Sequence, residues 1–441
     1  MCPVANQGGH LPVRGRASRA VPRALRLRSV CALHVGSSFS WKTLMFLRRS
    51  LLCLALATAA PAFAADITFW DTPQRGGNSF NENPPDRAYF QALRATGATW
   101  VRLSPDKWKS AGGRDFLIGD ADHYQGLVQA DVATLRRALD DANASGLKVV
   151  LVPLSLPLLR WKQKNGDKVD QRLWQSMDNH LPAQRFWRDL ATALKGHPAL
   201  AAYNLINEPA PEYGTALAEH APREAMRKWY AGVQGGPRDL RVLYRGLIAS
   251  VRAVDADMPL MLDAGWYAAA DAFDYWPAPL DDAKLLYSVH MYEPYAATSA
   301  PNQKRPTPYR YPAEVPFGAG SERWDKYRVR SYLQQPMGWA KTHGVGANRM
   351  VVGEFGCMRR WPDCSRYLQD VLQVLEQDKV HWAFYAFRED GWDGMDYELG
   401  DKALPWSYWQ AQEQGKSAVP PRSMQAPLFA PILQRLKAGN R

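Results

Sequence analysis

The chain has 441 residues, and its 55 Lys and Arg outnumber its 43 Asp and Glu, which gives a formal net charge of +12. Such a charge is typical of proteins that bind nucleic acid or anionic membranes, but its distribution argues against such a partner. Residues 1–64 contain nine basic residues and no acidic one, so residues 65–441 carry a net charge of only +3. With 46% hydrophobic and 22% charged residues, the composition excludes disordered and fibrous proteins.

The beginning of the chain resembles an export signal. The basic pair Arg48 and Arg49 precedes an apolar stretch, Leu51 to Ala60, that is too short to span a bilayer. Ala62-Phe63-Ala64 follows as a small-x-small cleavage site. This three-part pattern predicts a signal peptide over residues 45–64, and therefore a secreted or periplasmic protein.

Three segments of the chain follow from this signal. Since a signal peptide normally begins near the N-terminus, we expect Met45 to be the true start and residues 1–44 to be a mis-called extension or a disordered leader. Residues 65–441 contain no Ser/Gly linker and no sequence repeat, which favours one catalytic domain. No later window has 18 uncharged apolar residues, so we expect no membrane span in the mature chain.

Short apolar runs that end in polar or aromatic residues recur along the mature chain. In chain order they are Ile67–Trp70, Thr99–Leu103, Lys148–Leu154, Ala201–Asn207, Pro259–Asp263, Leu285–His290, Met350–Glu354 and His381–Phe387. Continuous apolar runs indicate strands buried on both faces, as in a parallel sheet. Between them apolar residues recur every three or four positions, as from Leu240 to Val254, which predicts amphipathic helices.

Eight strand-then-helix units in one domain predict an α/β fold, a (β/α)8 TIM barrel with long β-to-α loops. A doubly wound sheet is the competing architecture. It is disfavoured because no Gly-rich phosphate-binding turn follows the first predicted strand.

In a barrel of this kind, catalytic side chains project from the C-terminal ends of the strands. The residues at those positions are Arg102, Asn207, Glu208, Asp263, Trp266, His290, Tyr292, Glu293 and Glu354. Glu208 and Glu354 each follow an apolar strand directly. Two carboxylates across a cleft are what glycosidic bond cleavage requires, one to protonate the leaving oxygen and one to attack or to activate water. The alternative for either Glu is a solvated loop residue or an ion-pair partner.

The residues around these two glutamates add a family resemblance. Asn204-Leu-Ile-Asn-Glu-Pro209 resembles the acid/base motif of glycoside hydrolase family 5, the cellulase-like retaining enzymes. Arg75-Gly-Gly-Asn78 lies where that family has an Arg-Gly-x-Asn turn after its first strand. Arg102, His290-Met-Tyr292 and Val352-Gly-Glu-Phe-Gly356 are similar to its second, sixth and seventh strand motifs. The motifs occur in the family's order from residue 75 to about residue 390.

The resemblance implies a role for each matching residue. Glu208 would be the general acid/base and Glu354 the nucleophile of a double displacement with net retention, their carboxyl groups about 5–5.5 Å apart. Asn207 would bind the 2-hydroxyl of the sugar being cleaved. Tyr292 would hydrogen-bond the nucleophile, and the positive charge of Arg102 would keep Glu354 ionised.

The resemblance leaves the sugar-binding details open. His290 would line the same subsite. The family's eighth-strand Trp platform is replaced by Tyr385 or by the nearby Trp392, either of which could stack on a sugar ring. Val152-Pro-Leu-Ser155 stands where the family often has a His. The Trp residues in predicted loops, and so candidate platforms, are Trp108, Trp161, Trp266, Trp361 and Trp392.

Two further features concern cysteine and acidic residues. Cys357 and Cys364 are the only cysteines after the export segment, and an even pair in an exported protein predicts a disulfide, with two unpaired thiols as the alternative. The acidic segment 389–398 could contact sugar hydroxyls, hold calcium or be a solvated loop. No metal-ligand spacing such as His-Glu-x-x-His occurs, so we expect neither a metal nor a cofactor.

Together these features predict a monomeric endo-β-1,4-glucanase that cleaves β-linked oligo- or polysaccharide and has no nucleic-acid partner. A β-mannanase and an exo-acting β-glucosidase are alternatives on the same scaffold. A non-catalytic carbohydrate-binding protein is the alternative from another class, although the presence of both Glu208 and Glu354 disfavours it.

Overall fold

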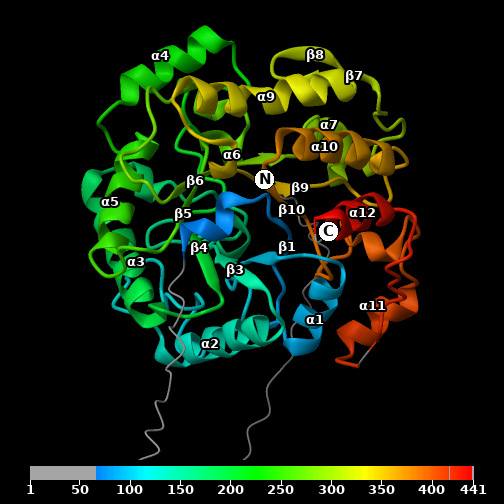
Figure 1. Ribbon diagram of the computed structural model, residues 1–441, viewed down its shortest axis with the longest axis horizontal. Helices are drawn as coiled ribbons and strands as arrows, with labels where there is room; N and C mark the ends of the chain where they lie inside the picture. The colour runs from blue at the N-terminus through cyan, green and yellow to red at the C-terminus, as the bar shows by residue number, and fades with distance from the viewer. Residues whose placement is uncertain (1–65, 417, 440–441) are drawn as a thin grey trace, which may run out of the picture. The chain divides into compact units, whose positions relative to one another are not determined.

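The computed structural model describes residues 66–416 and 418–439. The expected extension 1–44 and signal peptide 45–64 lie outside the described residues. Eight parallel strands close into a barrel in the order β1-β10-β9-β6-β5-β4-β3-β2 (Figure 1). The (β/α)8 TIM barrel expected from the sequence is therefore confirmed.

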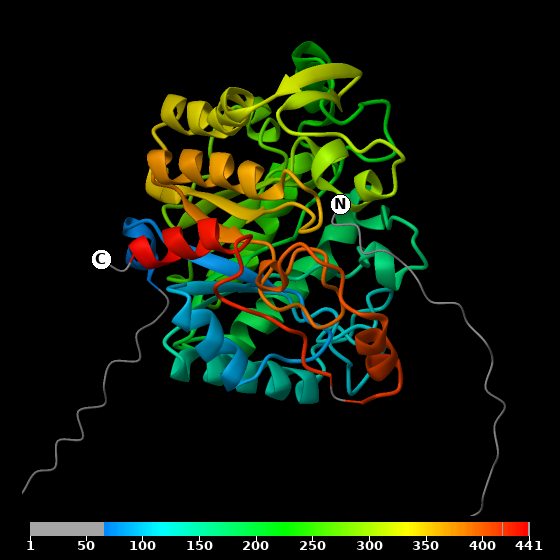
Figure 2. The same ribbon diagram turned by 90° about the vertical axis from the view of Figure 1, so that its right-hand side faces the viewer.

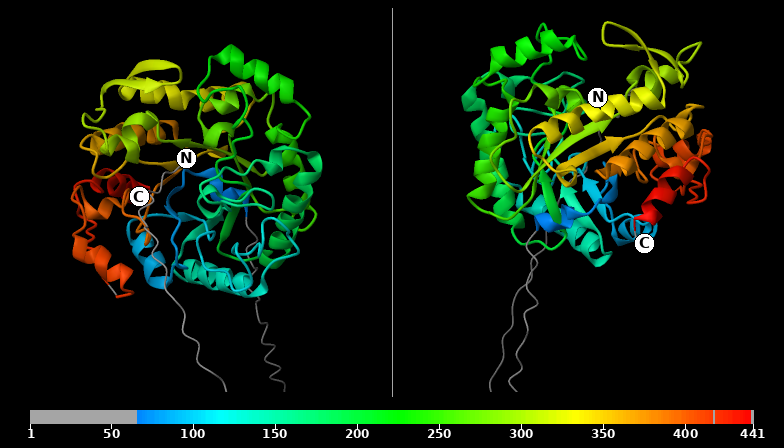
Figure 3. Two further views of the ribbon diagram at one scale, coloured as in Figure 1. Left: turned by 180° about the vertical axis from the view of Figure 1, so that it is seen from behind. Right: turned by 45° about the horizontal axis from the view of Figure 1, so that its top comes forward.

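The barrel strands follow the chain in sequence order. They are β1 (Arg75–Ser79), β2 (Trp100–Leu103), β3 (Lys148–Leu151), β4 (Leu200–Asn204), β5 (Leu260–Asp263), β6 (Leu285–Met291), β9 (Met350–Phe355) and β10 (His381–Phe384). An antiparallel hairpin of β7 (Ala313–Phe317) and β8 (Gly320–Trp324) interrupts the series after β6. It lies beyond α9, at the margin of the ring of helices (Figure 3).

Helices surround the barrel (Figures 1 and 2). They are α1 (Arg87–Ala95), α2 (Gln129–Ala144), α3 (His180–Leu194), α4 (Arg223–Val233), α5 (Leu240–Arg252), α6 (Gly265–Ala268), α7 (Tyr295–Thr298), α8 (Ala300–Gln303), α9 (Lys326–Thr342), α10 (Cys364–Asp378), α11 (Trp406–Glu413) and α12 (Ala430–Ala438). In α5 the expected apolar face is buried, with Leu243, Leu247 and Val251 fully covered. Among the helices of the described residues, none combines the length and the apolar character needed to cross a membrane.

The prediction of a strand at Ile67–Trp70 was wrong. These residues form the 3-10 helix η1 (Ile67–Asp71). The Trp70 side chain is fully buried, its indole Nε1 donates to the carbonyl of Ala201 at 3.1 Å, and its ring packs edge-on against Trp100. Trp70 belongs to the same apolar cluster as inward-facing residues of the strands. The aromatic run therefore packs against the interior of the barrel and does not add a strand to its sheet.

The first strand of the barrel is β1, the segment expected to form a turn. Arg75-Gly-Gly-Asn-Ser79 has no apolar side chain, yet it pairs with both β2 and β10. A β-carbon at Gly76 would lie 2.5 Å from the carbonyl oxygen of Trp100, closer than β-carbons approach other atoms. The same β-carbon would lie 2.9 Å from the Trp100 ring, and one at Gly77 would lie 3.0 Å from the Phe384 ring, so these glycines admit aromatic side chains of both neighbouring strands.

Candidate active site

Arg102, on β2, is the centre of a buried polar network at the C-terminal ends of the strands. Its side chain is fully buried. It donates from Nε to Asn204 Oδ1 at 2.9 Å, from Nη1 to Asn78 Oδ1 at 3.3 Å and Glu354 Oε1 at 2.5 Å, and from Nη2 to Asn207 Oδ1 at 2.7 Å and Asp263 Oδ2 at 3.3 Å. A guanidinium can serve all these acceptors because its five N–H groups have a fixed planar arrangement.

Glu354, on β9, accepts one hydrogen bond on each carboxylate oxygen. Arg102 binds Oε1, and the hydroxyl of Tyr292 donates to Oε2 at 2.7 Å. Glu354 pairs in register with His290 of the adjacent strand β6. The preceding residue, Gly353, makes room for that pairing, because a β-carbon there would lie 2.7 Å from Ser288 Oγ and 3.2 Å from His290 Nε2. The glycine of the Gly-Glu motif is thus a packing requirement.

Glu208 follows β4 in a left-handed backbone conformation, with φ of 47°. Residues with a β-carbon rarely adopt this conformation unless the surroundings hold them in it. Here the Glu208 amide donates to Asp263 Oδ2 at 3.1 Å, and His290 Nδ1 lies 2.9 Å from Glu208 Oε1. One carboxylate oxygen of Glu208, one of Glu354 and a ring nitrogen of His290 lie within 4.8 Å of one another.

The charges of this cluster are coupled through their proximity. Burial in the barrel raises the pKa of Glu354, and the positive charges of His290 and Arg102 act against that rise. Burial disfavours the charged form of His290, but the carboxylates of Glu354 and Asp263 outweigh it and raise the pKa of His290. The expected influence of Arg102 on Glu354 is therefore one of several opposing effects at this carboxylate.

A cavity of about 340 Å³ opens in front of the two glutamates. Its lining includes Phe80, Lys107, Leu154, Leu159, Trp161, Trp174, Asn207, Glu208, Pro209, Ala210, Tyr267, Tyr295, Glu354 and Tyr385. Lys107 forms an ion pair with Glu389 at 2.7 Å and lies over the ring of Trp161. The hydroxyl of Tyr385 also donates to Glu389, at 3.0 Å. Aromatic surfaces beside fixed polar groups suit a sugar, which has apolar C–H faces and hydroxyl edges.

The expected site residues divide into those that face the cavity and those behind it. Asn207, Glu208, Glu354 and Tyr385 line the cavity, whereas Arg102, His290 and Tyr292 contact the carboxylates from behind. Trp392 is half-buried, with its ring centroid 6.2 Å from that of Tyr385, and is not among the lining residues. Of the candidate platforms in loops, Trp161 lines the cavity, while Trp108, Trp266 and Trp361 are buried.

The sequence patterns did not predict several residues that line the cavity. Lys107 lies in the loop after β2, Tyr267 in the short segment α6 after β5 and Tyr295 at the start of α7 after β6, where no periodic pattern marks them. The sequence predicted only that Asp263 lies at the end of a strand. In the structure its two oxygens accept hydrogen bonds from Asn204, Arg102 and the Glu208 amide. Asn204 could have been suspected, because it lies inside the motif that contains Glu208.

The acidic segment 389–398 is bound to basic side chains and to backbone. Glu389 pairs with Lys107, Asp393 with Arg359, Asp396 with Arg422 and Glu398 with Arg388. Asp390 accepts from the backbone amides of Glu82 and Asn83. These contacts fasten the loop after β10 to its neighbours, so it is not a solvated acidic loop.

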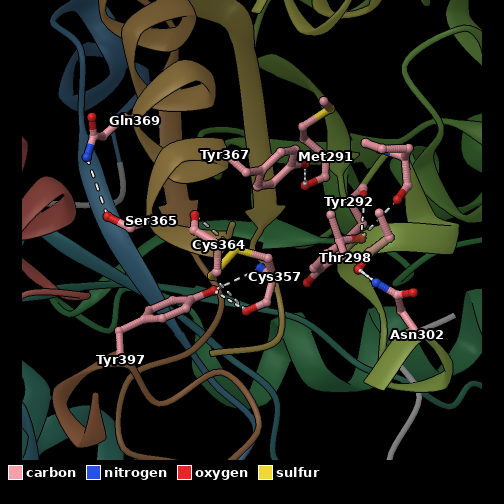
Figure 4. The surroundings of a disulfide bond; sticks show 12 residues. Met291, Tyr292, Thr298, Asn302, Cys357, Cys364, Ser365, Tyr367, Gln369 and Tyr397 are labelled. Carbon is pink, nitrogen blue, oxygen red and sulfur yellow. Dashed lines mark hydrogen bonds between the residues drawn. A yellow bond between two sulfur atoms is a disulfide. The ribbon is translucent and has the colours of Figure 1, made fainter. Parts of the chain in front are cut away.

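The predicted disulfide is present between Cys357 and Cys364, whose Cα atoms lie 5.6 Å apart. It joins the segment directly after β9, the strand that carries Glu354, to the first residue of α10 (Figure 4). The Cys357 amide donates to the hydroxyl of Tyr397 at 3.0 Å, and that hydroxyl donates to the Cys357 carbonyl at 3.2 Å. The alternative of two unpaired thiols is excluded.

Two groups of side chains in the described residues have ligand atoms close enough for a metal ion. One is Glu208, His290 and Glu354, and the other is Glu219, His220 and Glu293. In the first group, Arg102 and Tyr292 donate to Glu354, and His290 lies against Glu208. The imidazole of His220 lies 3.1 Å from Asp271 and 3.5 Å from Glu293, and although burial opposes its charged form, these two carboxylates raise the pKa of His220 to about 10. His220 therefore acts as a cation between carboxylates and competes with a metal.

Comparison with known proteins gives one family match. The family model described as cellulase (glycosyl hydrolase family 5) matches residues 65–391. A β-xylosidase from Phanerodontia chrysosporium is 21% identical over 244 residues, which cover 53% of this chain and 43% of that protein. The chain thus spans less than half the length of this relative.

Solved structures show the same fold at low sequence identity. A structure described as an endoglucanase has 18% identity and a TM-score of 0.55, covering 83% of this chain and 99% of its own. Endoglucanase Cel5A of Pseudomonas stutzeri has 16% identity and a TM-score of 0.55, covering 83% and 97%. Cel5A of Thermotoga maritima, solved with a mannotriose substrate, has 13% identity and a TM-score of 0.52, covering 75% and 93%.

Proposed function

Because this chain belongs to glycosyl hydrolase family 5, we propose that it is a retaining endo-β-1,4-glucanase. The observation that carries this proposal is the short separation of Glu208 and Glu354, whose nearest oxygens lie within 4.8 Å. Retaining glycosidases hold their carboxyl groups about 5–5.5 Å apart, whereas inverting enzymes need about 6.5–9.5 Å to admit a water molecule. The geometry supports direct attack by a carboxylate.

In the first step Glu354 attacks the anomeric carbon and forms a glycosyl ester, while Glu208 protonates the departing glycosidic oxygen. In the second step Glu208 removes a proton from water, and the resulting hydroxide displaces Glu354 from the same carbon. Arg102 and Tyr292 each bind one oxygen of Glu354. These bonds stabilise the carboxylate as a leaving group and orient it toward the cavity.

Asn207 and His290 would prepare the substrate and the acid for this reaction. Arg102 occupies the side-chain oxygen of Asn207, so its NH₂ group is left to donate to the 2-hydroxyl, an interaction that strengthens in the transition state. The hydrogen bond between His290 Nδ1 and Glu208 Oε1 gives Glu208 a nearby proton source. The carboxylates of Glu354 and Asp263 raise the pKa of His290, which favours the protonated imidazole beside Glu208.

The choice of a β-1,4-linked glucan is supported by the endoglucanase structures with the same fold and by the aromatic cavity wall of Trp161, Tyr385 and Phe80. An exo-acting β-glycosidase is the second candidate, because the matching curated protein is named a β-xylosidase. A β-mannanase remains an alternative on the same machinery.

A panel of substrates tests the proposal. Soluble β-1,4-glucan, β-mannan, xylan and 4-nitrophenyl β-glycosides are incubated with the enzyme, and the anomeric configuration of the first product is followed by NMR. We expect rapid loss of viscosity for the glucan and a β-configured product. Release of single sugars from chain ends would favour the exo-acting enzyme, an α-configured product would refute retention, and no hydrolysis at all would favour a carbohydrate-binding protein.

Two variants separate the roles of the glutamates. Glu354→Gln should lose activity on every substrate, by about 10⁴-fold or more. Glu208→Ala should lose activity on glucan but keep it on aryl glycosides whose leaving group needs no proton, and azide should restore turnover as a β-glycosyl azide. Glu413→Gln, at an exposed position on α11, is the matched control. Near-full activity of Glu354→Gln would contradict the nucleophile assignment.

We also propose that the enzyme is exported as a monomer after cleavage behind residue 64. The proposal rests on the three-part signal pattern at residues 45–64. N-terminal sequencing of the native mature protein and its molar mass by light scattering test it. A peptide from residues 1–44 in the native precursor would contradict translation from Met45.

A further inference from the structure

Three consecutive residues after β5 have a left-handed backbone, although none is a glycine. Trp266, Tyr267 and Ala268 have φ values of 45°, 61° and 64°. In this region the β-carbon crowds the backbone, so residues other than glycine adopt it one at a time and seldom in a run. A run of three persists only where the surrounding structure holds it, and such runs concentrate at functional sites.

Glu212 supplies the contact that holds this turn. Its side chain is fully buried, and its Oε2 accepts a hydrogen bond from the Trp266 amide at 3.0 Å. The hydroxyl of Tyr230, from α4, donates to the other oxygen. A β-carbon at residue 265 would lie 2.2 Å from Glu212 Oε1, so Gly265 leaves the space that the carboxylate occupies.

The turn is joined on its other side to the segment that carries Glu208. The Tyr267 amide donates to the carbonyl of Pro209 at 3.2 Å, and Pro209 follows Glu208 directly. Tyr267, Glu208, Pro209 and Ala210 all line the cavity. Since Glu208 protonates the departing oxygen, the cavity wall beside it faces the leaving sugar, and Tyr267 stands on that side.

We propose that Glu212 is a positioning residue for the leaving-group side of the cavity, where it holds the 266–268 turn and so places Tyr267 against the departing part of the substrate. This inference rests on the proposed glycosidase function. Glu212 does not reach the reacting atoms and is outside the machinery of Arg102, His290 and Tyr292. Burial raises the pKa of Glu212 to about 7, which is consistent with a carboxyl group retained inside the protein for its hydrogen bonds.

The test compares two substrates that share their glycone and differ in the leaving group. One is a β-1,4-gluco-oligosaccharide with several sugars beyond the cleaved bond, and the other is a 4-nitrophenyl cellobioside. For Glu212→Ala, and likewise for Tyr267→Ala, we expect kcat/KM on the oligosaccharide to fall about tenfold more than on the aryl glycoside. The variant that combines Glu212→Ala with Tyr267→Ala should lose no more kcat/KM on the oligosaccharide than either single variant, because both changes remove the same contact with the leaving sugar.

Conservative variants and a control make the test specific. Glu212→Gln keeps an acceptor for the Trp266 amide and can donate to Tyr230, so it should restore the substrate ratio to within about twofold of the wild type. Tyr230→Phe is the milder test if Glu212→Ala fails to fold. Glu224→Ala, exposed in the first turn of the same helix as Tyr230, should leave the ratio unchanged. Equal losses on both substrates for Glu212→Ala would overturn the proposal.

A crystal structure of Glu212→Ala distinguishes failure of this inference from failure of the glycosidase assignment. If the turn keeps positive φ at all three residues and Tyr267 still lines the cavity, the inference is wrong whatever the enzyme hydrolyses. If the turn relaxes and Tyr267 leaves the cavity, the positioning role is supported even where the substrate panel points to another sugar.

Discussion

Replacing Arg102 by Met would remove the guanidinium that pairs with Glu354 at 2.5 Å and with Asp263 at 3.3 Å. Both carboxylates are at most 1% exposed. Removing one partner of a buried ion pair leaves an uncompensated charge and costs about 3–5 kcal/mol. We therefore expect the free energy of unfolding of Arg102→Met to fall by about that amount at pH 7.

The loss should depend on pH in a definite direction. Without Arg102 the folded-state pKa of Glu354 rises further above its value in the unfolded chain. A carboxyl group with a raised folded-state pKa stabilises the fold below its unfolded-state pKa and loses that contribution as pH increases through the folded-state value. The difference between wild type and Arg102→Met should accordingly be larger at pH 7 than at pH 5.

Urea unfolding at the two pH values, together with kcat on an aryl glycoside, measures both effects. Arg102→Lys is the matched control, because it keeps the charge but cannot reproduce the planar set of donors. It should retain more stability than Arg102→Met and still lose activity. An Arg102→Met protein within 1 kcal/mol of wild type at pH 7, or with unchanged kcat, would refute the reasoning.

Three further predictions concern parts of the molecule away from Arg102. His381 accepts from the Gln74 amide through Nδ1 and contacts a carbonyl through Nε2, and burial lowers its pKa to about 4. We therefore expect the free energy of unfolding of the wild type to fall by about 3 kcal/mol between pH 6.5 and pH 4, because the buried imidazole becomes protonated. Unfolding measured at both pH values should show a much smaller loss for His381→Asn. Replacing Cys357 and Cys364 together by Ser should lower the free energy of unfolding by about 2 kcal/mol, because the disulfide no longer restricts the unfolded chain, and an unchanged urea midpoint would contradict this. Trp161→Ala should raise KM for a gluco-oligosaccharide about fivefold to tenfold at nearly constant kcat, since the ring lines the cavity without touching the carboxylates, and steady-state kinetics with no change in KM would exclude a stacking role.

The barrel strands show how far the sequence alone leads. The apolar runs that end at Arg102, Glu208 and Glu354 predicted buried parallel strands, and the rule that catalytic groups follow such strands pointed to both glutamates without the structure. The run at Ile67–Trp70 satisfied the same criterion and became a 3-10 helix. Hydropathy does not distinguish an aromatic segment that packs against the barrel interior from one that adds a strand to the sheet.

The first strand shows the opposite failure. Arg75-Gly-Gly-Asn78 contains no apolar side chain, so a hydropathy pattern assigns it to a turn, although its backbone pairs on both sides. The aromatic rings packed against its glycines belong to Trp100 and Phe384 on the two neighbouring strands. A strand whose core contacts are supplied by a neighbour cannot be identified from its own residues.

By itself the sequence determined most of the barrel strands, and it predicted an export signal and two catalytic carboxylates, because each depends on local composition or on a short motif. Only the tertiary structure decided which distant groups bind them. Arg102 meets Asp263 and Glu354, and Glu212 meets Trp266, across separations that no local pattern encodes. Loop residues such as Lys107 and Trp161 reach the cavity through the ion pair of Lys107 with Glu389 and the packing of Lys107 over the Trp161 ring.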